Sequence, residues 1–252
     1  MGHASQDDVP SVPDPTAVTG KELEKSRTTR RRILDAARDL LANVGYAKFS
    51  TAAVAEGAGL TRPAMLYHFG SRQELLNATI QFLARRRIEL FQAAMAEATA
   101  RHGDDRIAIR LAAVDITLDH AVLPEHLAFQ ELVMAARTDP ELAAVVAPAV
   151  AYFETMRVRA TFHSLPQHMI APHDFQLVRD VVRLVSEAVT WPHAFTFDKE
   201  RRLKALRQFL RLLVASDAGG DFVAAVATSM GDAATPMPDG ADPEAGPTRP
   251  SD

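Results

Sequence analysis

Residues 50–75 read STAAVAEGAGLTRPAMLYHFGSRQEL, and this stretch decides the fold of the first third of the chain. Gly59 separates two short helical patterns, and Thr61 is well placed to cap the second of them. Pro63 fits the first turn of that second helix, where its missing N–H is not needed. Ser71 and Glu74 then form a capping-box pattern that opens a third, much longer helix. Two short helices joined by a glycine-containing turn predict a helix-turn-helix.

Helical periodicity continues on both sides of this motif, and almost no alternation of strand type is present. Over residues 27–44, Ile33, Leu34 and Leu41 belong to one apolar stripe, and Gly45 follows where a helix C-terminus favours a left-handed residue. Further helices are expected at 51–57, 62–68, 71–100, 105–121, 124–137, 140–163, 174–191 and 199–214. We expect Pro148 to kink the 140–163 helix or to mark its true start. The sequence therefore predicts an all-α protein of about nine helices.

Composition excludes several kinds of chemistry. The 252 residues include no cysteine, so disulfides, thiol catalysis and thiolate metal sites are excluded. The N-terminal residues lack the apolar core of a secretory signal, and no apolar run is long enough to span a membrane. We therefore expect a cytoplasmic protein with no membrane partner and no cofactor.

Charge is distributed unevenly. Residues 21–90 carry 13 basic and 7 acidic groups, whereas residues 91–252 carry 15 basic and 22 acidic groups. A positive block followed by a negative remainder suggests a module that faces a polyanion, joined to a second functional unit. A solvated surface would give the same asymmetry, so the charge pattern supports DNA binding without establishing it.

The span from Arg31 to Leu76 resembles the DNA-binding domain of the tetracycline-repressor (TetR) family of bacterial transcription regulators. The resemblance rests on RRILDAARDLLANVGY and on AVAEGAGLTRPAMLYHFGSRQELL, with Ala58-Gly59 at the turn, Tyr67-His68-Phe69 closing the short helix, and Gly70–Leu75 opening the next. It implies a helical effector-binding and dimerisation domain after the helix-turn-helix. The implied organisation is a disordered arm (1–24), the DNA-binding domain (25–72), the helical domain (73–217) and a largely disordered tail (218–252).

The resemblance implies contacts between the helix-turn-helix and duplex DNA. The residues at the matching positions are Thr51, Thr61, Arg62, Ala64, Leu66, Tyr67, His68 and Arg72. At Leu66 the family commonly has a tyrosine that touches the backbone; leucine cannot donate a hydrogen bond, although it could meet a thymine methyl. Phe69 is assigned to the core instead.

Basic residues at the start of the first helix have two interpretations. Arg30 and Arg31 belong to a run that could follow phosphates or enter the minor groove, or could simply be the solvated start of a helix. Changing them should flatten the salt dependence of DNA binding without changing the preferred sequence.

The last two helices have more apolar surface than one core stripe needs. In the resembled family such helices form a four-helix dimer interface. A dimer of this kind would place two recognition helices about one DNA turn apart. The candidate interface residues are Leu177, Val181, Leu184, Val185, Leu206, Phe209 and Leu213. The alternative is that both helices are interior.

Large apolar side chains in the middle of the chain are candidates for an effector pocket. They are Phe91, Phe129, Met134, Tyr152, Phe153, Met156 and Trp191. For each residue taken singly, ordinary core is the better explanation, so the pocket is implied by the resemblance rather than by the pattern. A small hydrophobic effector that releases a repressor from a palindromic operator is the expected mode of action.

Three readings compete with this one. His163, His168 and His173 could hold a metal and make a metal-responsive regulator of the same fold, but their spacing fits neither a helical face nor a tight zinc loop, and we expect no metal site. An all-helical enzyme is disfavoured because no catalytic triad, phosphate-binding glycine loop or paired carboxylates are present. A nonspecific DNA-coating protein would differ by binding random duplex as tightly as a palindrome.

Overall fold

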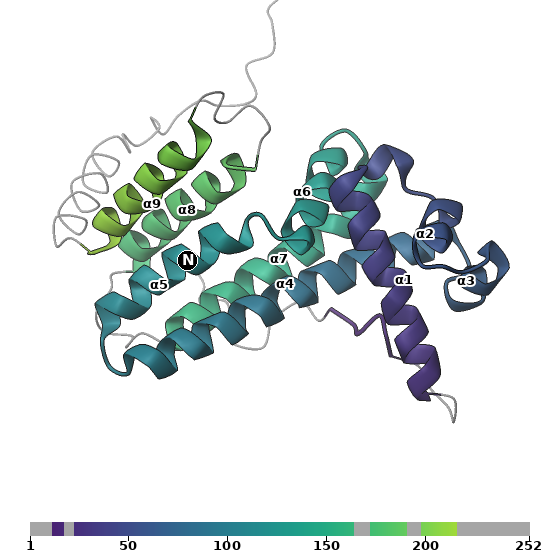
Figure 1. The fold of residues 1–252 in the computed structure, drawn as a ribbon, viewed down its shortest axis with the longest axis horizontal. Coiled ribbons are helices and arrows are strands. Elements are labelled where there is room, and N and C mark those ends of the chain that lie inside the picture. Colours follow the sequence, from purple (N-terminus) through teal and green to yellow (C-terminus); the bar gives the residue numbers. More distant parts are fainter. Residues whose placement is uncertain (1–11, 18–22, 164–171, 191–197, 216–252) are drawn as a thin grey trace, which may run out of the picture.

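The computed structural model describes residues 12–17, 23–163, 172–190 and 198–215, and within these ranges every regular element is helical (Figure 1). The prediction of an all-α fold is confirmed. The elements are α1 (Leu23–Asn43), the 3-10 helix η1 (Tyr46–Lys48), α2 (Thr51–Gly57), α3 (Arg62–His68), α4 (Arg72–His102), α5 (Arg106–His120), α6 (Pro124–Ala136), α7 (Pro140–His163), α8 (Pro172–Ala188) and α9 (Lys199–Ala215).

The helix bounds differ from the predicted ones mainly at ends without a capping signal. The first helix begins at Leu23, four residues before the predicted start, and η1 was not predicted. Pro148 lies inside α7, so the prediction that it might mark the true start of this helix is wrong. The helix starts at Pro140, where a missing backbone N–H costs nothing because no intrahelical partner exists there.

The largest hydrophobic cluster joins the helix-turn-helix to the helices beyond it. It contains Ile33 and Leu34 from α1, Met65 from α3, Leu132 from α6 and Val146 from α7. No break in this core occurs at residues 72 and 73, where a domain boundary was expected. Because buried side chains of both parts share one cluster and α1 packs on α4 and α6, the helix-turn-helix and the helices beyond it share one core.

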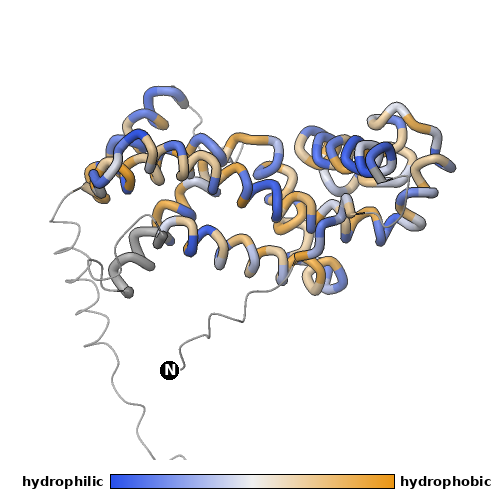
Figure 2. Tube along the Cα trace, turned by 90° about the horizontal axis from the view of Figure 1, so that it is seen from below, coloured by the Kyte–Doolittle hydropathy of each residue, from blue (hydrophilic) through white to orange (hydrophobic). Residues whose placement is uncertain are grey.

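Two smaller clusters lie along the rest of the molecule. One joins α5, α8 and α9 through Val114, Val182 and Leu210. The other surrounds Phe91 of α4 and includes Ile109 of α5, with side chains of α7 packed against it. Figure 1 shows α8 and α9 at the end of the molecule opposite α2 and α3. Figure 2 shows hydrophilic and hydrophobic residues alternating within single helices, as expected of amphipathic helices that bury one face.

Part of the segment expected to be a disordered arm lies on the fold. Val12 is 8% exposed, and its carbonyl accepts a hydrogen bond from Arg85 Nη1 of α4 at 3.0 Å. The carbonyl of Pro15 accepts one from Arg30 Nε of α1 at 2.9 Å. Residues 12–17 therefore connect α1 to α4, and α1 itself begins inside the range predicted as arm.

Among the described helices, none combines the length and the apolar character that crossing a bilayer requires.

Candidate nucleic-acid interface and interior cavity

Side-chain caps and one left-handed glycine set the geometry of the helix-turn-helix. Ser50 Oγ accepts from Ala53 N at the start of α2, and Thr61 Oγ1 accepts from Ala64 N at the start of α3. Between the two helices Gly59 adopts φ 62°, a conformation that a residue with a Cβ rarely adopts. The tight turn at Gly59 changes the direction of the chain between α2 and α3. One face of the short α3 is therefore not covered by α2.

The exposed face of α3 carries polar and small side chains. Arg62 and Ala64 are exposed, Tyr67 is 82% exposed, and His68 is half-buried. On the opposite face Met65 is fully buried, and Phe69, which follows the helix, is also fully buried. Met65 and Phe69 fix the orientation of α3 on the core. The exposed residues on the opposite face therefore point toward solvent.

Two of the predicted DNA contacts face the protein instead of solvent. Thr51 is only 9% exposed at the first position of α2. Leu66 is half-buried and packs against the main core cluster. Core packing explains why an apolar residue is suitable at Leu66, where the resembled family commonly has tyrosine. The exposed cap residue Thr61 uses its hydroxyl oxygen on Ala64 N but keeps its O–H free to donate.

Arg30 and Arg31 point into the fold more than sequence reasoning expected. Arg30 Nη1 donates to the carbonyl of His68, and the guanidinium lies 4.1 Å from the centre of the Phe69 ring. Burial lowers the pKa of Arg30 from its usual value. Arg31 pairs with Asp35 at 3.2 Å and lies over the ring of Phe82. The geometry gives Arg30 a role in fastening the end of α3 to α1.

Arg72 lies at the first position of α4, as the sequence predicted, and is exposed. Its Nε donates to the carbonyl of Phe49 at 3.1 Å, and the guanidinium lies 5.3 Å from the centre of the Tyr46 ring. Ser71 caps this helix by accepting from Glu74 N at 3.0 Å, while Glu74 accepts from Gly70 N. The two terminal nitrogens of Arg72 therefore remain available at a helix N-terminus, a position that favours a phosphate.

Helix α6 is fastened to the helix-turn-helix by two polar contacts. Glu131 Oε1 accepts from Tyr46 N at 2.7 Å. Arg38 of α1 pairs with Glu125 at 3.1 Å, and Glu125 is only 8% exposed. Sequence reasoning missed both contacts, because the partners lie more than eighty residues apart.

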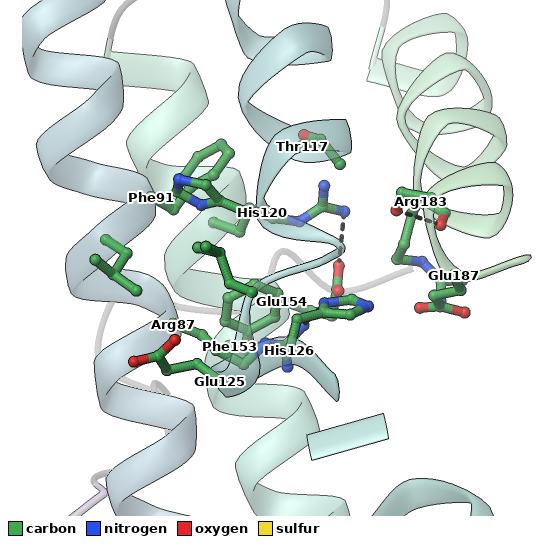
Figure 3. Close-up of a pocket in the computed structure, with 14 residues that line it drawn as sticks. Arg87, Phe91, Thr117, His120, Glu125, His126, Phe153, Glu154, Arg183 and Glu187 are labelled. Atoms are coloured by element: carbon green, nitrogen blue, oxygen red, sulfur yellow. Dashed lines mark hydrogen bonds and ion pairs between the residues drawn. The ribbon is translucent and has the colours of Figure 1, made fainter. Parts of the chain in front are cut away.

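An interior cavity of about 40 Å³ lies among α4, α5, α6, α7 and α8, within a wider recess of about 520 Å³ that includes solvent-open space (Figure 3). Charged side chains make up much of its wall. The lining consists of Arg87, Leu90, Phe91, Thr117, His120, Leu123, Glu125, His126, Phe153, Glu154, Arg157, Arg183, Ser186 and Glu187.

Only two of the predicted pocket residues, Phe91 and Phe153, line this cavity. Phe129 lies beneath Arg87 instead, 4.6 Å from the guanidinium carbon. Tyr152 and Met156 pack against the cluster around Phe91. Met134 is 54% exposed and does not reach the cavity, whereas Trp191 lies outside the described residues. Where the sequence suggested a purely apolar pocket, the structure has one whose lining combines aromatic and aliphatic side chains with charged ones.

Two basic groups in the cavity, Arg87 and His126, have strongly lowered pKa values. Arg87 Nη2 lies 3.2 Å from His126 Nδ1, and its guanidinium carbon is 3.8 Å from the centre of the Phe153 ring. Burial lowers the pKa of Arg87 to about 9. Burial and the neighbouring Arg87 charge lower the pKa of His126 to about 3, so this histidine is neutral at ordinary pH. The wall therefore holds a cation with little solvent to stabilise it.

Exposed apolar side chains mark the faces of α8 and α9. Leu184 is 55% exposed, Phe209 is 60% exposed, and Leu212 is 59% exposed. Val181 and Val185 pack against the cluster that joins α5, α8 and α9, while Leu206 and Leu213 are half-buried. The side chain of Leu177 lies outside the described residues. The predicted dimer residues thus divide into outward-facing ones and ones that hold α8 on its own chain.

Within the described ranges, no group of three or more histidine or acidic side chains is arranged to hold a metal ion. The side chain of His163, residue His168 and the side chain of His173, which sequence analysis considered as metal ligands, lie outside those ranges.

Residues 33–79 match the family model described as bacterial regulatory proteins, tetR family. The chain is 34% identical over 121 residues to HTH-type transcriptional regulators of Mycobacterium tuberculosis and Mycobacterium bovis. That match covers 48% of this chain and 60% of each relative.

Solved structures of low sequence identity have the same fold. A TetR-family transcriptional regulator from Rhodococcus sp. superposes with a TM-score of 0.57 at 19% identity, covering 75% of this chain and all of that one. The fatty acid degradation regulator FadR from Bacillus halodurans gives a TM-score of 0.54 at 16% identity, covering 80% of this chain and 98% of that one.

Proposed function

We propose that this chain is a TetR-family transcriptional regulator and not an enzyme, and that it binds a palindromic DNA operator as a homodimer and is released from it by a small effector. The observation that carries the proposal is the presentation of α3. Arg62, Ala64 and Tyr67 face solvent on a helix that Met65 and Phe69 anchor in the core. Such a helix can enter the major groove while α2 crosses the backbone.

The proposed DNA contacts divide by chemistry. Arg62 and Tyr67 are the candidates for base contacts, because they are exposed and can reach beyond the helix surface. Thr61 and Arg72 are candidates for phosphate contacts, since both lie at helix N-termini. His68 is held beside them, and burial together with the Arg30 charge lowers its pKa, which favours the neutral ring as a hydrogen-bonding group.

The proposed response to an effector passes through α6. Glu125 and His126, at the start of α6, line the cavity, and Glu125 also pairs with Arg38 of α1. Five residues further along α6, Glu131 holds the backbone of Tyr46 just before α2. An occupant that displaces the start of α6 would therefore pull on α1 and on the segment before α2. That change would alter how α3 is presented.

A homodimer through α8 and α9 is supported by the exposed apolar side chains of Leu184, Phe209 and Leu212. Burying them against a second copy removes apolar area from water and pairs the same surface with itself, as a two-fold interface requires. Two copies would then present two α3 helices to the half-sites of one palindrome.

Selection of bound fragments from a random duplex pool, at a fixed and stated salt concentration, tests the proposal. We expect a palindromic sequence to be enriched and to bind at least roughly a thousandfold more tightly than random duplex at matched salt. Fragments without a common half-site, or equal affinity for all duplexes, would contradict a specific regulator. The Tyr67→Ala variant, selected in parallel, should enrich the same sequence less strongly.

A further inference from the structure

Each carboxylate that the described residues place in the cavity wall already has an arginine partner. Glu154 pairs with Arg157 at 3.2 Å, and Glu187 pairs with Arg183 at 3.0 Å. Glu125 pairs with Arg38, which reaches the carboxylate from α1. Among the described residues, no carboxylate lies within ion-pair distance of the remaining cavity arginine, Arg87. Among the described lining residues, Arg87 is therefore the arginine without a carboxylate partner, although the lining as a whole holds three arginines and three glutamates.

Two further cavity groups are buried and lack a hydrogen-bond partner in the described structure, namely His126 Nε2 and Arg157 Nε. Both side chains are more than nine-tenths buried. Because Arg87 can only donate, His126 Nδ1 must accept from it, which places the imidazole proton on Nε2. Arg157 Nε is also a donor. Both orphaned groups are therefore donors without a hydrogen-bond acceptor. Because buried donors are normally paired, we expect a bound molecule to supply the acceptor.

From the guanidinium of Arg87, which no carboxylate pairs, and from the orphaned donors we infer that the occupant of this cavity is a small organic monocarboxylate, whose carboxylate faces Arg87 and whose apolar body lies against the aromatic wall. This inference rests on the proposed function, in which an effector binds in this cavity, and adds the chemical class of that effector.

The single guanidinium without a carboxylate partner favours a monoanion. One unpaired guanidinium matches one carboxylate, and its planar fork suits a carboxylate with two parallel hydrogen bonds. A dianion such as phosphate would leave one negative charge unpaired in a wall that already holds three glutamates. The cavity of about 40 Å³ has room for a carboxylate head group, and it opens toward solvent, where an apolar body can extend. Phe91 and Phe153 supply the apolar contact for that body (Figure 3).

The test measures binding to the full chain in the absence of DNA, with phenylacetate and hexanoate compared with phenylacetamide, hexanamide and 2-phenylethylamine. Thermal unfolding and titration calorimetry supply the readouts. We expect the two acids to raise the melting temperature and to bind roughly tenfold or more tightly than the matched amides, because charge-assisted hydrogen bonds are the stronger kind. The amine should not bind.

Variants then locate the interaction. Arg87→Met should reduce acid binding by roughly tenfold or more while leaving amide binding unchanged. Arg101→Gln, at the far end of the same helix and exposed, is the matched control and should bind the acids like the unmodified chain. Should Arg87→Met fail to unfold cooperatively, Arg87→Lys replaces it, because lysine keeps the charge but lacks the planar fork. The comparison of acid with amide on the unmodified chain requires no variant.

The inference is overturned if the amides or the amine bind as well as the acids, if inorganic phosphate binds more tightly than either acid, if neither acid binds at about 10 mM, or if Arg87→Met binds the acids normally. Its failure is distinct from that of the proposed function. A chain that binds a specific duplex but no carboxylate is a regulator with another effector, whereas one that binds carboxylates but no duplex is not the proposed regulator.

Discussion

The end of the molecule that carries α2 and α3 and the end that carries α8 and α9 differ in how they are held. The first is fixed by a core that runs through five other elements, with fully buried side chains such as Leu34, Met65 and Phe69. In the part of the chain that the structure describes, the second rests on a cluster of five buried residues and on ion pairs at the surface. In these pairs Arg207 and Arg211 of α9 both bind Asp115 of α5.

The difference indicates what each end can do without a partner. The α3 end has a complete core, so its exposed residues are free for recognition. The α8 and α9 end leaves Leu184, Phe209 and Leu212 in water, and half-exposed ion pairs add little stability there. A second copy of the chain would complete that end. The predictions below test this contrast, from the largest effect to the smallest.

Replacing Phe69 by Ala should have the largest effect on folding. The ring is fully buried and lies under Arg30, so its loss leaves a cavity in the main core. We expect the free energy of unfolding to fall by about 3–5 kcal/mol, measured by urea denaturation. A loss below about 1 kcal/mol would mean that the α3 end is less tightly packed than its burial indicates.

Replacing Phe209 by Glu should separate the two copies without unfolding either one. The side chain is 60% exposed, so a single chain loses little, whereas a charge in a buried interface should weaken association by about 2–4 kcal/mol. Sedimentation velocity measures the shift from dimer to monomer. Lys204→Glu, about 140° around the helix from Phe209, serves as the control and should stay dimeric. An unmodified chain that is already monomeric would refute the contrast between the two ends.

Replacing Tyr67 by Ala should affect DNA binding and leave stability unchanged. Tyr67 is 82% exposed, so the free energy of unfolding should change by less than about 0.5 kcal/mol. Operator affinity should fall by about 1–3 kcal/mol, measured by fluorescence anisotropy at fixed salt. Together with Phe69→Ala, two residues further along the chain, this change separates recognition from packing. Equal losses in both assays would argue against an outward role for α3.

Acid should destabilise the cavity region through His126. Its pKa is about 3 in the folded chain, against about 6.5 when unfolded, so between these values only the unfolded state binds the proton. The free energy of unfolding should therefore fall as pH drops below about 6.5, by up to about 1.4 kcal/mol per pH unit from this group. The unfolding free energy of His126→Gln, measured from pH 7 to pH 4, should depend less steeply on pH. An unchanged slope would assign the acid sensitivity to other groups.

Replacing Glu131 by Gln should give the smallest of these effects. Gln can still accept from Tyr46 N but without the carboxylate charge, so we expect a loss of about 0.5–1.5 kcal/mol in unfolding free energy. If α6 couples the cavity to the helix-turn-helix, operator affinity should also change, although no DNA contact has been removed. Stability that falls while operator affinity stays the same would show that Glu131 fastens the two parts without coupling them.

The elements of the helix-turn-helix could be predicted to the residue because their signals are local. Thr61 and Pro63 define the start of α3, Gly59 defines the turn before it, and Ser71 starts α4. The three-residue η1 was missed, because so short an element has no periodic pattern. Arg30 was expected to face DNA or solvent, since nothing in the sequence indicates that its partner is a carbonyl 38 residues away.

The cavity residues had one sequence signal that could have been used. Leu83, Arg87 and Phe91 are spaced by four and share one face of α4, and both flanking residues are buried. An arginine within an apolar stripe is therefore a candidate for an interior charge. His126, Arg157 and Glu125 have no such signal, because their roles depend on side chains from other helices.

By itself the sequence determined the helical class, the helix-turn-helix and the identity of the helix that faces outward. Caps, turns and apolar periodicity act between residues at most a few positions apart, so spacing alone reveals them. Tertiary structure alone decided the surroundings of Arg85, Arg86 and Arg87, which are three consecutive arginines. Arg85 donates to the carbonyl of Val12, Arg86 pairs with the carboxylate of Glu89, and Arg87 lines the interior cavity. The physical reason is that a side chain's charge is read from the sequence, but its solvation and partners depend on which distant helices pack around it.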